Sequence, residues 1–267
     1  MSKTAIALTI AGSDSGGGAG IQADLKTFSA LGVYGASVIT ALTAQNTVGV
    51  QGIHDVPAAF VARQMESVFA DIAVDAVKIG MLSVPETIEA VADGLSRSFT
   101  GPVVLDPVMI AASGDALLTE AAISTLKTRL LPLADLLTPN LPEAARLLDA
   151  DIARDEAEMR EQGLALLAMG PKAVLMKGGH GTGPEAVDLL VTSDETFRFS
   201  APRIASRNSH GTGCTLSSAI TAGLAKGMSL NAAVSAAKAY VHGAILHADR
   251  LAIGHGHGPT HHFFALW

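Results

Sequence analysis

The chain contains little cysteine, few aromatic residues and little charge. Its 267 residues include one cysteine, Cys214, so it cannot hold an internal disulfide framework or a zinc site built from several cysteines. Aromatic residues make up 4%, and 18 Lys and Arg stand against 25 Asp and Glu. This acidic balance argues against nucleic acid as a partner, because such interfaces need a basic surface. Charged residues make up 16%, below the usual share of roughly 25%, which favours an oligomer that buries part of the surface.

The chain also lacks a hydrophobic run of the length needed to span a membrane. Its longest uncharged stretch, 27–53, is interrupted by four glycines and by Gln45 and Asn46. An apolar run at 5–11 leads directly into a glycine-rich turn, which favours a first β-strand over a signal peptide. We therefore expect a cytoplasmic protein with no membrane partner. Its 49% hydrophobic residues are enough for a substantial core.

Short β-branched runs alternate with helical patterns along most of the chain, which predicts a parallel sheet covered by helices on both faces. No linker divides the sequence, so a single domain over 1–267 is expected. The strands are predicted at 5–11, 35–42, 74–79, 103–105, 136–138 and 173–176, followed by a hairpin of 187–191 and 196–200. The helices are predicted at 20–31, 58–70, 85–98, 120–131, 142–148, 155–168, 213–226 and 231–251.

The first motif that could bind a ligand is AGSDSGGGAG at 11–20, between a predicted strand and a predicted helix. Glycines there allow positive φ angles and let a ligand approach the backbone closely. The motif is not a GxxxxGK[ST] phosphate-binding loop, a GxGxxG motif or a GxSxG nucleophile turn. A plain turn between strand and helix remains the alternative to ligand contact.

A second motif, HGTGCT at 210–215, precedes a helical pattern. Its glycines favour free backbone N–H groups at a helix N-terminus, which is an anion-binding arrangement. We interpret it as an anion hole for a transferring phosphoryl group, with Cys214 facing the acceptor. The field of the helix is expected to lower the pKa of the Cys214 thiol. The alternative is an ordinary helix start with a buried thiol.

Polar residues follow three of the predicted strands, where open α/β sheets bind their ligands. Asp106 ends one strand and suits Mg²⁺. Asn140 and Glu143 follow another strand; they could order Mg²⁺ and phosphates, or equally form a capping box of the next helix. Lys177 precedes two glycines and could reach a phosphate.

The C-terminal segment 255–263 carries four of the nine histidines. Neither a cysteine nor a well-spaced carboxylate completes a metal site there, so a solvated or interface tail is expected.

Taken together, these motifs resemble the bacterial hydroxymethylpyrimidine/phosphomethylpyrimidine kinases of thiamin synthesis, which belong to the ribokinase-like superfamily. The resemblance covers nearly the whole chain. The glycine-rich opening and HGTGC are typical of this branch and of its pyridoxal-kinase-like relatives, whereas LDPVM and TPN occur more widely. The matching segments are AGSDSGGGAGIQADLK (11–26), VITALTAQNT (38–47), VKIGML (77–82), VLDPVM (104–109), TPNLPEA (138–144), MKGGH (176–180), HGTGCTLS (210–217) and GPTHHF (258–263).

This resemblance implies a three-layer α/β/α sandwich with a mostly parallel central sheet and a small β-flap over the substrate, usually in a homodimer. It implies phosphoryl transfer from MgATP to the hydroxymethyl group of 4-amino-5-hydroxymethyl-2-methylpyrimidine, and then to the monophosphate at the same site. ATP and Mg²⁺ are the implied cosubstrate and cofactor.

The resemblance also implies a role for each matching residue. Asp106 and Glu143 would organise Mg²⁺, and Lys177 and Asn140, with Glu143, would contact ATP. Cys214 occupies the place where many related sugar kinases have an aspartate base, and a thiolate there could accept the acceptor's proton. The anion hole would comprise Gly211, Thr212 and Gly213, and the pyrimidine pocket Gly12, Asp24, Gln45, Met81 and Val108.

Three other functions compete with this one. A pyridoxal kinase would use the same scaffold and a similar flat substrate. Gln45 and the GPTHHF segment favour the pyrimidine, and the Gln45 amide has both a donor and an acceptor for an aminopyrimidine edge. A non-catalytic binding protein would be expected to have lost Asp106, the anion hole or Cys214. A thiol hydrolase would need a base beside Cys214, and no sequence spacing supplies one.

Overall fold

The computed structural model describes residues 3–109, 118–179, 181 and 183–267. Its described strands form a nine-stranded sheet in the order β3-β2-β1-β4-β5-β6-β7-β8-β9. The strands are β1 (Ile6–Asp14), β2 (Tyr34–Asn46), β3 (Gly49–Asp55), β4 (Ala76–Ile79), β5 (Val103–Leu105), β6 (Leu136–Leu137), β7 (Val174–Lys177), β8 (Glu185–Val191) and β9 (Thr196–Pro202).

The centre of this sheet is parallel and its two ends are antiparallel. Strands β2, β1, β4, β5, β6 and β7 pair in parallel. Strand β3 pairs antiparallel with β2, and β8 and β9 extend the other end as an antiparallel hairpin. The mostly parallel sheet is confirmed. It places the carboxyl ends of six strands along one edge, where a ligand site is expected.

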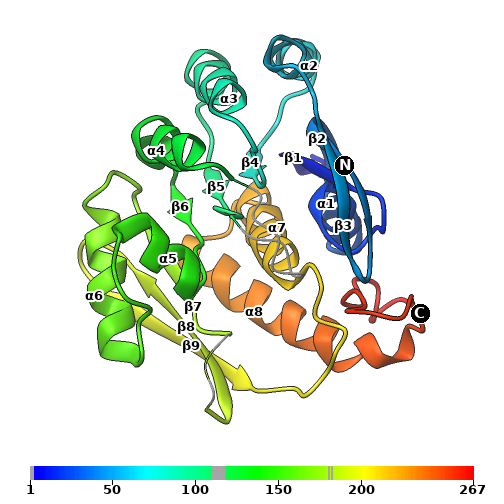
Figure 1. The fold of residues 1–267 in the computed structure, drawn as a ribbon, viewed down its shortest axis with the longest axis vertical. Helices are drawn as coiled ribbons and strands as arrows, with labels where there is room; N and C mark the ends of the chain where they lie inside the picture. The colour runs from blue at the N-terminus through cyan, green and yellow to red at the C-terminus, as the bar shows by residue number, and fades with distance from the viewer. Residues whose placement is uncertain (1–2, 110–117, 180, 182) are drawn as a thin grey trace.

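Helices cover both faces of the sheet, so the predicted three-layer α/β/α arrangement is confirmed (Figure 1). On one face pack α2 (Ala58–Asp71), α3 (Pro85–Ser98), α4 (Glu120–Arg129), α5 (Leu141–Leu148) and α6 (Glu156–Leu167). The other face carries α1 (Gly20–Ala30), α7 (Thr212–Ala225) and α8 (Leu230–Leu246). Short 3-10 turns follow α4 at Leu131–Leu133 and α8 at Ala248–Arg250.

The alternation of side chains along the central strands builds two apolar cores. Val103 and Leu105 of β5 point into the cluster beneath α2 to α6, whereas Val104 between them points into the cluster beneath α7 and α8. All three are buried, as expected of a strand covered on both sides. No helix in the described ranges is long and apolar enough to cross a membrane.

Two elements differ from the prediction. Strand β2 continues to Asn46 and pairs with β3, which the sequence analysis did not predict because GVQGIHD (49–55) is polar, glycine-containing and largely exposed. We assign the implied β-flap to this hairpin, because Thr43 and Gln45 of β2 line the cavity described below. The last long helix ends at Leu246 instead of 251, and after it the His247 ring stacks on Phe264 of the C-terminal segment, with ring centroids 5.3 Å apart.

Candidate active site

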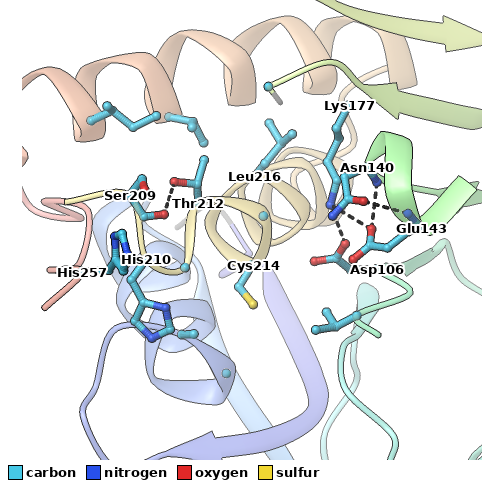
Figure 2. A pocket seen from close by; sticks show the side chains of 18 of the residues that line it. Asp106, Asn140, Glu143, Lys177, Ser209, His210, Thr212, Cys214, Leu216 and His257 are labelled. Carbon is cyan, nitrogen blue, oxygen red and sulfur yellow. Dashed lines mark hydrogen bonds and ion pairs between the residues drawn. The ribbon is translucent and has the colours of Figure 1, made fainter. Parts of the chain in front are cut away.

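A cavity of about 730 Å³ opens at the carboxyl edge of the parallel strands, beside the N-terminus of α7. Figure 2 shows His210 and Ser209 on one side of this helix end and Lys177, Asp106 and Glu143 on the other. Twelve of the predicted site residues line the cavity. They are Gly12, Gln45, Met81, Asp106, Val108, Asn140, Glu143, Lys177, Gly211, Thr212, Gly213 and Cys214.

Asp14 holds the glycine-rich loop in place. Its carboxylate accepts hydrogen bonds from the backbone N–H groups of Gly16 (2.8 Å), Gly18 (3.1 Å) and Ala19 (2.8 Å). The same carboxylate lies 2.9 Å from His210 Nε2. Burial opposes the charge on Asp14, but these contacts outweigh it and lower the pKa of the carboxyl group. A single acid therefore ties the loop to the start of the HGTGC motif.

The N-terminus of α7 has the features of an anion site. Gly211 precedes the helix with φ of 78°, and a Cβ there would lie 1.9 Å from the carbonyl oxygen of Gly18, so only glycine fits. No side chain caps this end. The Thr212 N–H donates to the Ser209 carbonyl at 3.2 Å, so the N–H groups of the next residues, Gly213 and Cys214, together with the helix dipole, favour an anion in the cavity.

A buried ion pair borders the cavity on the far side of this helix end. Lys177 Nζ lies 2.8 Å from Asp106 Oδ1 and 3.9 Å from Glu143 Oε2. Thr138 and Ser217 hydroxyls donate to the two Asp106 oxygens at 3.1 and 3.2 Å. Burial opposes both charges, yet the attraction between them raises the pKa of Lys177 and lowers that of Asp106, so both groups are charged.

Asn140 and Glu143 form the predicted capping box of α5 and also line the cavity. The Glu143 N–H donates to Asn140 Oδ1 and the Asn140 N–H donates to Glu143 Oε2, both at 2.8 Å. Burial raises the pKa of Glu143 to about 7, because Lys177 offsets the desolvation only in part and Asp106 adds repulsion. The local and the ligand-binding interpretations are thus compatible.

The expected activation of Cys214 is wrong for the ligand-free protein. Burial raises the pKa of its thiol to about 11, although Lys78 and the backbone N–H of Gly20 act in the opposite direction. Desolvation here outweighs the field of the helix terminus. The thiol is therefore protonated at neutral pH.

Gln45 lies near the end of β2, in the part of the strand that continues beyond the predicted end at residue 42, and it lines the cavity. Its side chain accepts from the Thr43 hydroxyl at 3.1 Å, and its Nε2 lies 3.3 Å from His210 Nε2. The Met81 side chain packs closely against Gly12: a Cβ on Gly12 would lie 2.7 Å from the Met81 methyl carbon. The Met81 methyl group thus packs against the Gly12 backbone, and both residues line the cavity.

Asp24 does not line the cavity, so the prediction that it contacts the substrate has to be corrected. Its side chain is fully buried beneath the site, where both oxygens are taken up by Lys78 Nζ at 3.0 and 2.8 Å. The Thr9 and Ser218 hydroxyls each donate to it at 2.6 Å. Helix α1 turns this residue inward, toward Lys78 of β4, so that it is not part of the cavity wall.

Two ion pairs at or beneath the cavity were not predicted from the sequence. One is Lys78 with Asp24; the signal that could have found it is a lysine inside a buried strand. The other joins Lys238 of α8 to Asp188 of β8 at 2.6 Å, and Asp188 also accepts from the Gly178 N–H at 3.0 Å. Lys238 and Asp188 lie far apart in sequence, so no local pattern pairs them.

The histidine-rich tail is only partly the expected solvated segment. Residues 258–262 are buried against the anion-hole loop: His210 N–H donates to the Gly258 carbonyl at 3.0 Å. His262 Nε2 lies 3.1 Å from the Thr215 hydroxyl, and burial lowers its pKa to about 4. The neutral imidazole supports the first turn of α7 from behind.

Comparison with known proteins gives a consistent family. The family model described as phosphomethylpyrimidine kinase matches residues 14–261. A hydroxymethylpyrimidine/phosphomethylpyrimidine kinase of Rhizobium meliloti (strain 1021) is 63% identical over 264 residues, covering 99% of each chain. The crystal structure of phosphomethylpyrimidine kinase from Clostridium difficile 630 is 48% identical, with a TM-score of 0.81 over 91% of this chain and 100% of the other. An ADP complex of Bacillus subtilis pyridoxal kinase is 36% identical, with a TM-score of 0.90 over 97% and 98% of the two chains.

Proposed function

The chain belongs to the phosphomethylpyrimidine kinase family, and we propose from its site how it performs that family's reaction. It is a kinase of thiamin biosynthesis that transfers phosphoryl groups from ATP to hydroxymethylpyrimidine and then to phosphomethylpyrimidine. The observation that carries the mechanism is the uncapped N-terminus of α7, which Figure 2 shows between His210 and Lys177; Gln45 lines the same cavity.

We assign the donor nucleotide to the side of Lys177. The ammonium group of Lys177 is held by Asp106, so it meets the ATP phosphates as a fixed charge. Gly211, Thr212 and Gly213 would surround the phosphoryl group in flight, with the Gly213 N–H as a donor and the Thr212 N–H available once it leaves the Ser209 carbonyl. Phosphoryl transfer requires mainly positioning and neutralisation of charge, and these groups supply both.

The donor side also fits Mg²⁺. Asp106 and Glu143 present two carboxylates, and Mg²⁺ commonly binds through one or two carboxylates with water and phosphate completing its shell. Within the described ranges no cluster of three or more His, Cys, Asp or Glu side chains could hold a metal without such help. When bound, Mg²⁺ neutralises the phosphate oxygens of ATP. Glu143 must lose its proton to act as a ligand, and its pKa of about 7 allows this at neutral pH.

We assign the pyrimidine to the opposite side, where Gly12, Met81 and Val108 offer apolar contacts and Gln45 offers an amide. The Gln45 amide can both donate to a ring nitrogen and accept from the amino group. Cys214 would then face the hydroxymethyl oxygen. Its thiol is protonated in the free enzyme, so Cys214 must first release its own proton to solvent, and the thiolate then accepts the hydroxymethyl proton as the new bond forms.

We propose three further properties of the whole molecule. One sheet that runs through the chain supports a single kinase domain over 1–267. Exposed Leu42, Val48 and Ile53 on the β2–β3 hairpin support a homodimer, because exposed apolar patches mark interfaces, and sedimentation analysis tests this. Its use of ATP supports a place in the cytoplasm.

The test is coupled release of ADP from purified protein with MgATP and either hydroxymethylpyrimidine or pyridoxal. Release with hydroxymethylpyrimidine supports the proposed reaction. Release with pyridoxal alone would move the activity to vitamin B6 and leave the geometry of the site intact. Release with neither acceptor would overturn the proposed function.

A further inference from the structure

A fully buried ion pair lies beneath the cavity, outside the mechanism described so far. Lys78 of β4 and Asp24 of α1 are both 0% exposed, with Lys78 Nζ 2.8 Å from Asp24 Oδ2. Hydroxyls from two more elements complete the cluster. Thr9 of β1 donates to Oδ2 and Ser218 of α7 donates to Oδ1, each at 2.6 Å. Four elements of the fold thus converge on one pair of charges.

Stability of the fold does not explain this pair. Taking an ammonium and a carboxylate out of water is costly, and apolar residues of similar volume often stabilise a protein equally well or better. The adjacent residues of β1 and β4, which are Leu8, Ile10, Val77 and Ile79, point to the opposite face of the sheet and build the apolar core beneath α2 to α6, so the pair takes no part in that core. A charge kept in such a place calls for a functional reason.

The pair has a definite orientation. Lys78 lines the cavity, together with Cys214 and Asp106, whereas Asp24 does not. The positive end therefore faces the reacting groups, and the negative end is turned away against the Thr9 and Ser218 hydroxyls. A Cβ on Gly80 would lie 2.8 Å from Lys78 Nζ, so the glycine leaves room for the ammonium group.

The pair also lies directly below Cys214. Ser218 is four residues further along α7, so it lies one turn beneath Cys214 on the same face of the helix. The titratable groups around Lys78 are Asp24 from α1, Cys214 from α7 and Asp106 after β5. Burial opposes the charge on Lys78, but these groups outweigh the burial and raise the Lys78 pKa. Lys78 in turn is the strongest influence that lowers the pKa of the Cys214 thiol, which burial raises.

We propose that Lys78, fixed by Asp24, is a positioning residue whose charge stabilises negative charge at Cys214 and at the acceptor oxygen. This inference rests on the proposed function for its effect on transfer. The fixed charge acts through the protein interior, where electrostatic effects are stronger than in water, and it needs no rearrangement during the reaction. It adds to the helix dipole of α7 from below.

The test compares wild type with Lys78→Met and with the double variant Lys78→Met/Asp24→Asn. The double variant leaves no unpaired buried charge, so it carries the test if Lys78→Met does not fold. Alkylation of the sole cysteine by iodoacetamide at pH 9, without substrate, reports the thiolate of Cys214 alone. We expect its rate to fall by about threefold or more in both variants, because less thiolate forms.

In the same variants we expect kcat for the first transfer to fall by about fivefold or more, with KM for ATP and pyrimidine changed by less than about twofold. Lys172→Met is the matched control, since it removes a lysine from an exposed ion pair with Asp135 and should change neither rate. An alkylation rate or a kcat equal to that of wild type in the folded double variant would overturn the proposal. If wild type itself releases no ADP with the pyrimidine, the proposed function fails, and alkylation alone still decides the effect of Lys78 on Cys214.

Discussion

Gly213 offers the sharpest test of the anion hole, because a single methyl group there should improve the fold and impair the reaction. Gly213 is the second residue of α7 and does not have the positive φ that would exclude alanine. A Cβ at this position would lie 3.3 Å from Lys177 Nζ and 3.7 Å from Asp106 Oδ2. Gly213→Ala therefore places a methyl group where the transferring phosphate would meet Lys177.

The two effects can be given magnitudes. Alanine in place of a helical glycine stabilises a protein by about 0.5–1 kcal/mol. The tight contact with Lys177 takes back part of this gain, so the melting temperature should stay equal or rise slightly. Gly213→Ala keeps its backbone N–H, but the methyl group would push the phosphoryl group away from the donors. Loss of one well-placed donor to a developing charge costs roughly 10²–10³ in kcat, and we expect a fall of up to that order.

The assay pairs thermal unfolding with coupled ADP release. Gly52→Ala on the exposed strand β3 is the control, because a Cβ there meets only Ala44 Cβ, at 3.9 Å. It should leave both the melting temperature and kcat near their wild-type values. A Gly213→Ala protein that folds and retains the wild-type kcat would refute the placement of the phosphoryl group at this helix end.

Three further predictions follow from the titratable groups of the site. The pKa of Glu143 is about 7 in the folded protein, above its ordinary value, so the free energy of unfolding without ATP should fall as pH rises from about 4.5 to 7. Glu143→Gln should lose this pH dependence, and in urea unfolding at pH 8 it should be more stable than wild type by up to about 3 kcal/mol. A difference that is the same at pH 5 and pH 8 would count against burial of Glu143 as its cause. Asp106→Asn leaves the buried Lys177 charge without its carboxylate partner, so it should lower the free energy of unfolding by about 3 kcal/mol and lower kcat more than about tenfold. A variant with normal turnover would contradict the assignment of the ATP phosphates to the Lys177 side. The thiol pKa of Cys214 is about 11, so the rate of its alkylation should rise about tenfold per pH unit between pH 8 and 10. Cys214→Ala should lower turnover yet still bind the pyrimidine in calorimetry, and unchanged turnover would exclude a role for the thiol in proton transfer.

The sequence predicted best the features that depend on local patterns. Buried runs such as 103–105 match their strand to the residue, because a strand covered on both faces must be continuously apolar. The ends of parallel strands meet at one edge of a sheet, so Asp106, Asn140 and Lys177 could be expected to lie together.

The features that were missed depend on tertiary contacts. Strand β3 is polar and exposed, and it exists because β2 offers it a partner. Asp24 of α1 faces the buried Lys78 of β4, a contact that no spacing along the chain encodes. The pKa of Cys214 depends on how deeply the finished fold buries the thiol, and this burial outweighs the helix terminus that the local sequence reveals.

The central claim is that one anion hole serves two successive transfers, and a phosphorus-31 NMR time course tests it most directly. Hydroxymethylpyrimidine would be mixed with excess MgATP and either the wild-type protein or Gly213→Ala. We predict that the monophosphate signal rises and then gives way to the diphosphate, and that Gly213→Ala slows both steps. A reaction that stops at the monophosphate, or a variant that slows one step and leaves the other unchanged, would contradict the account.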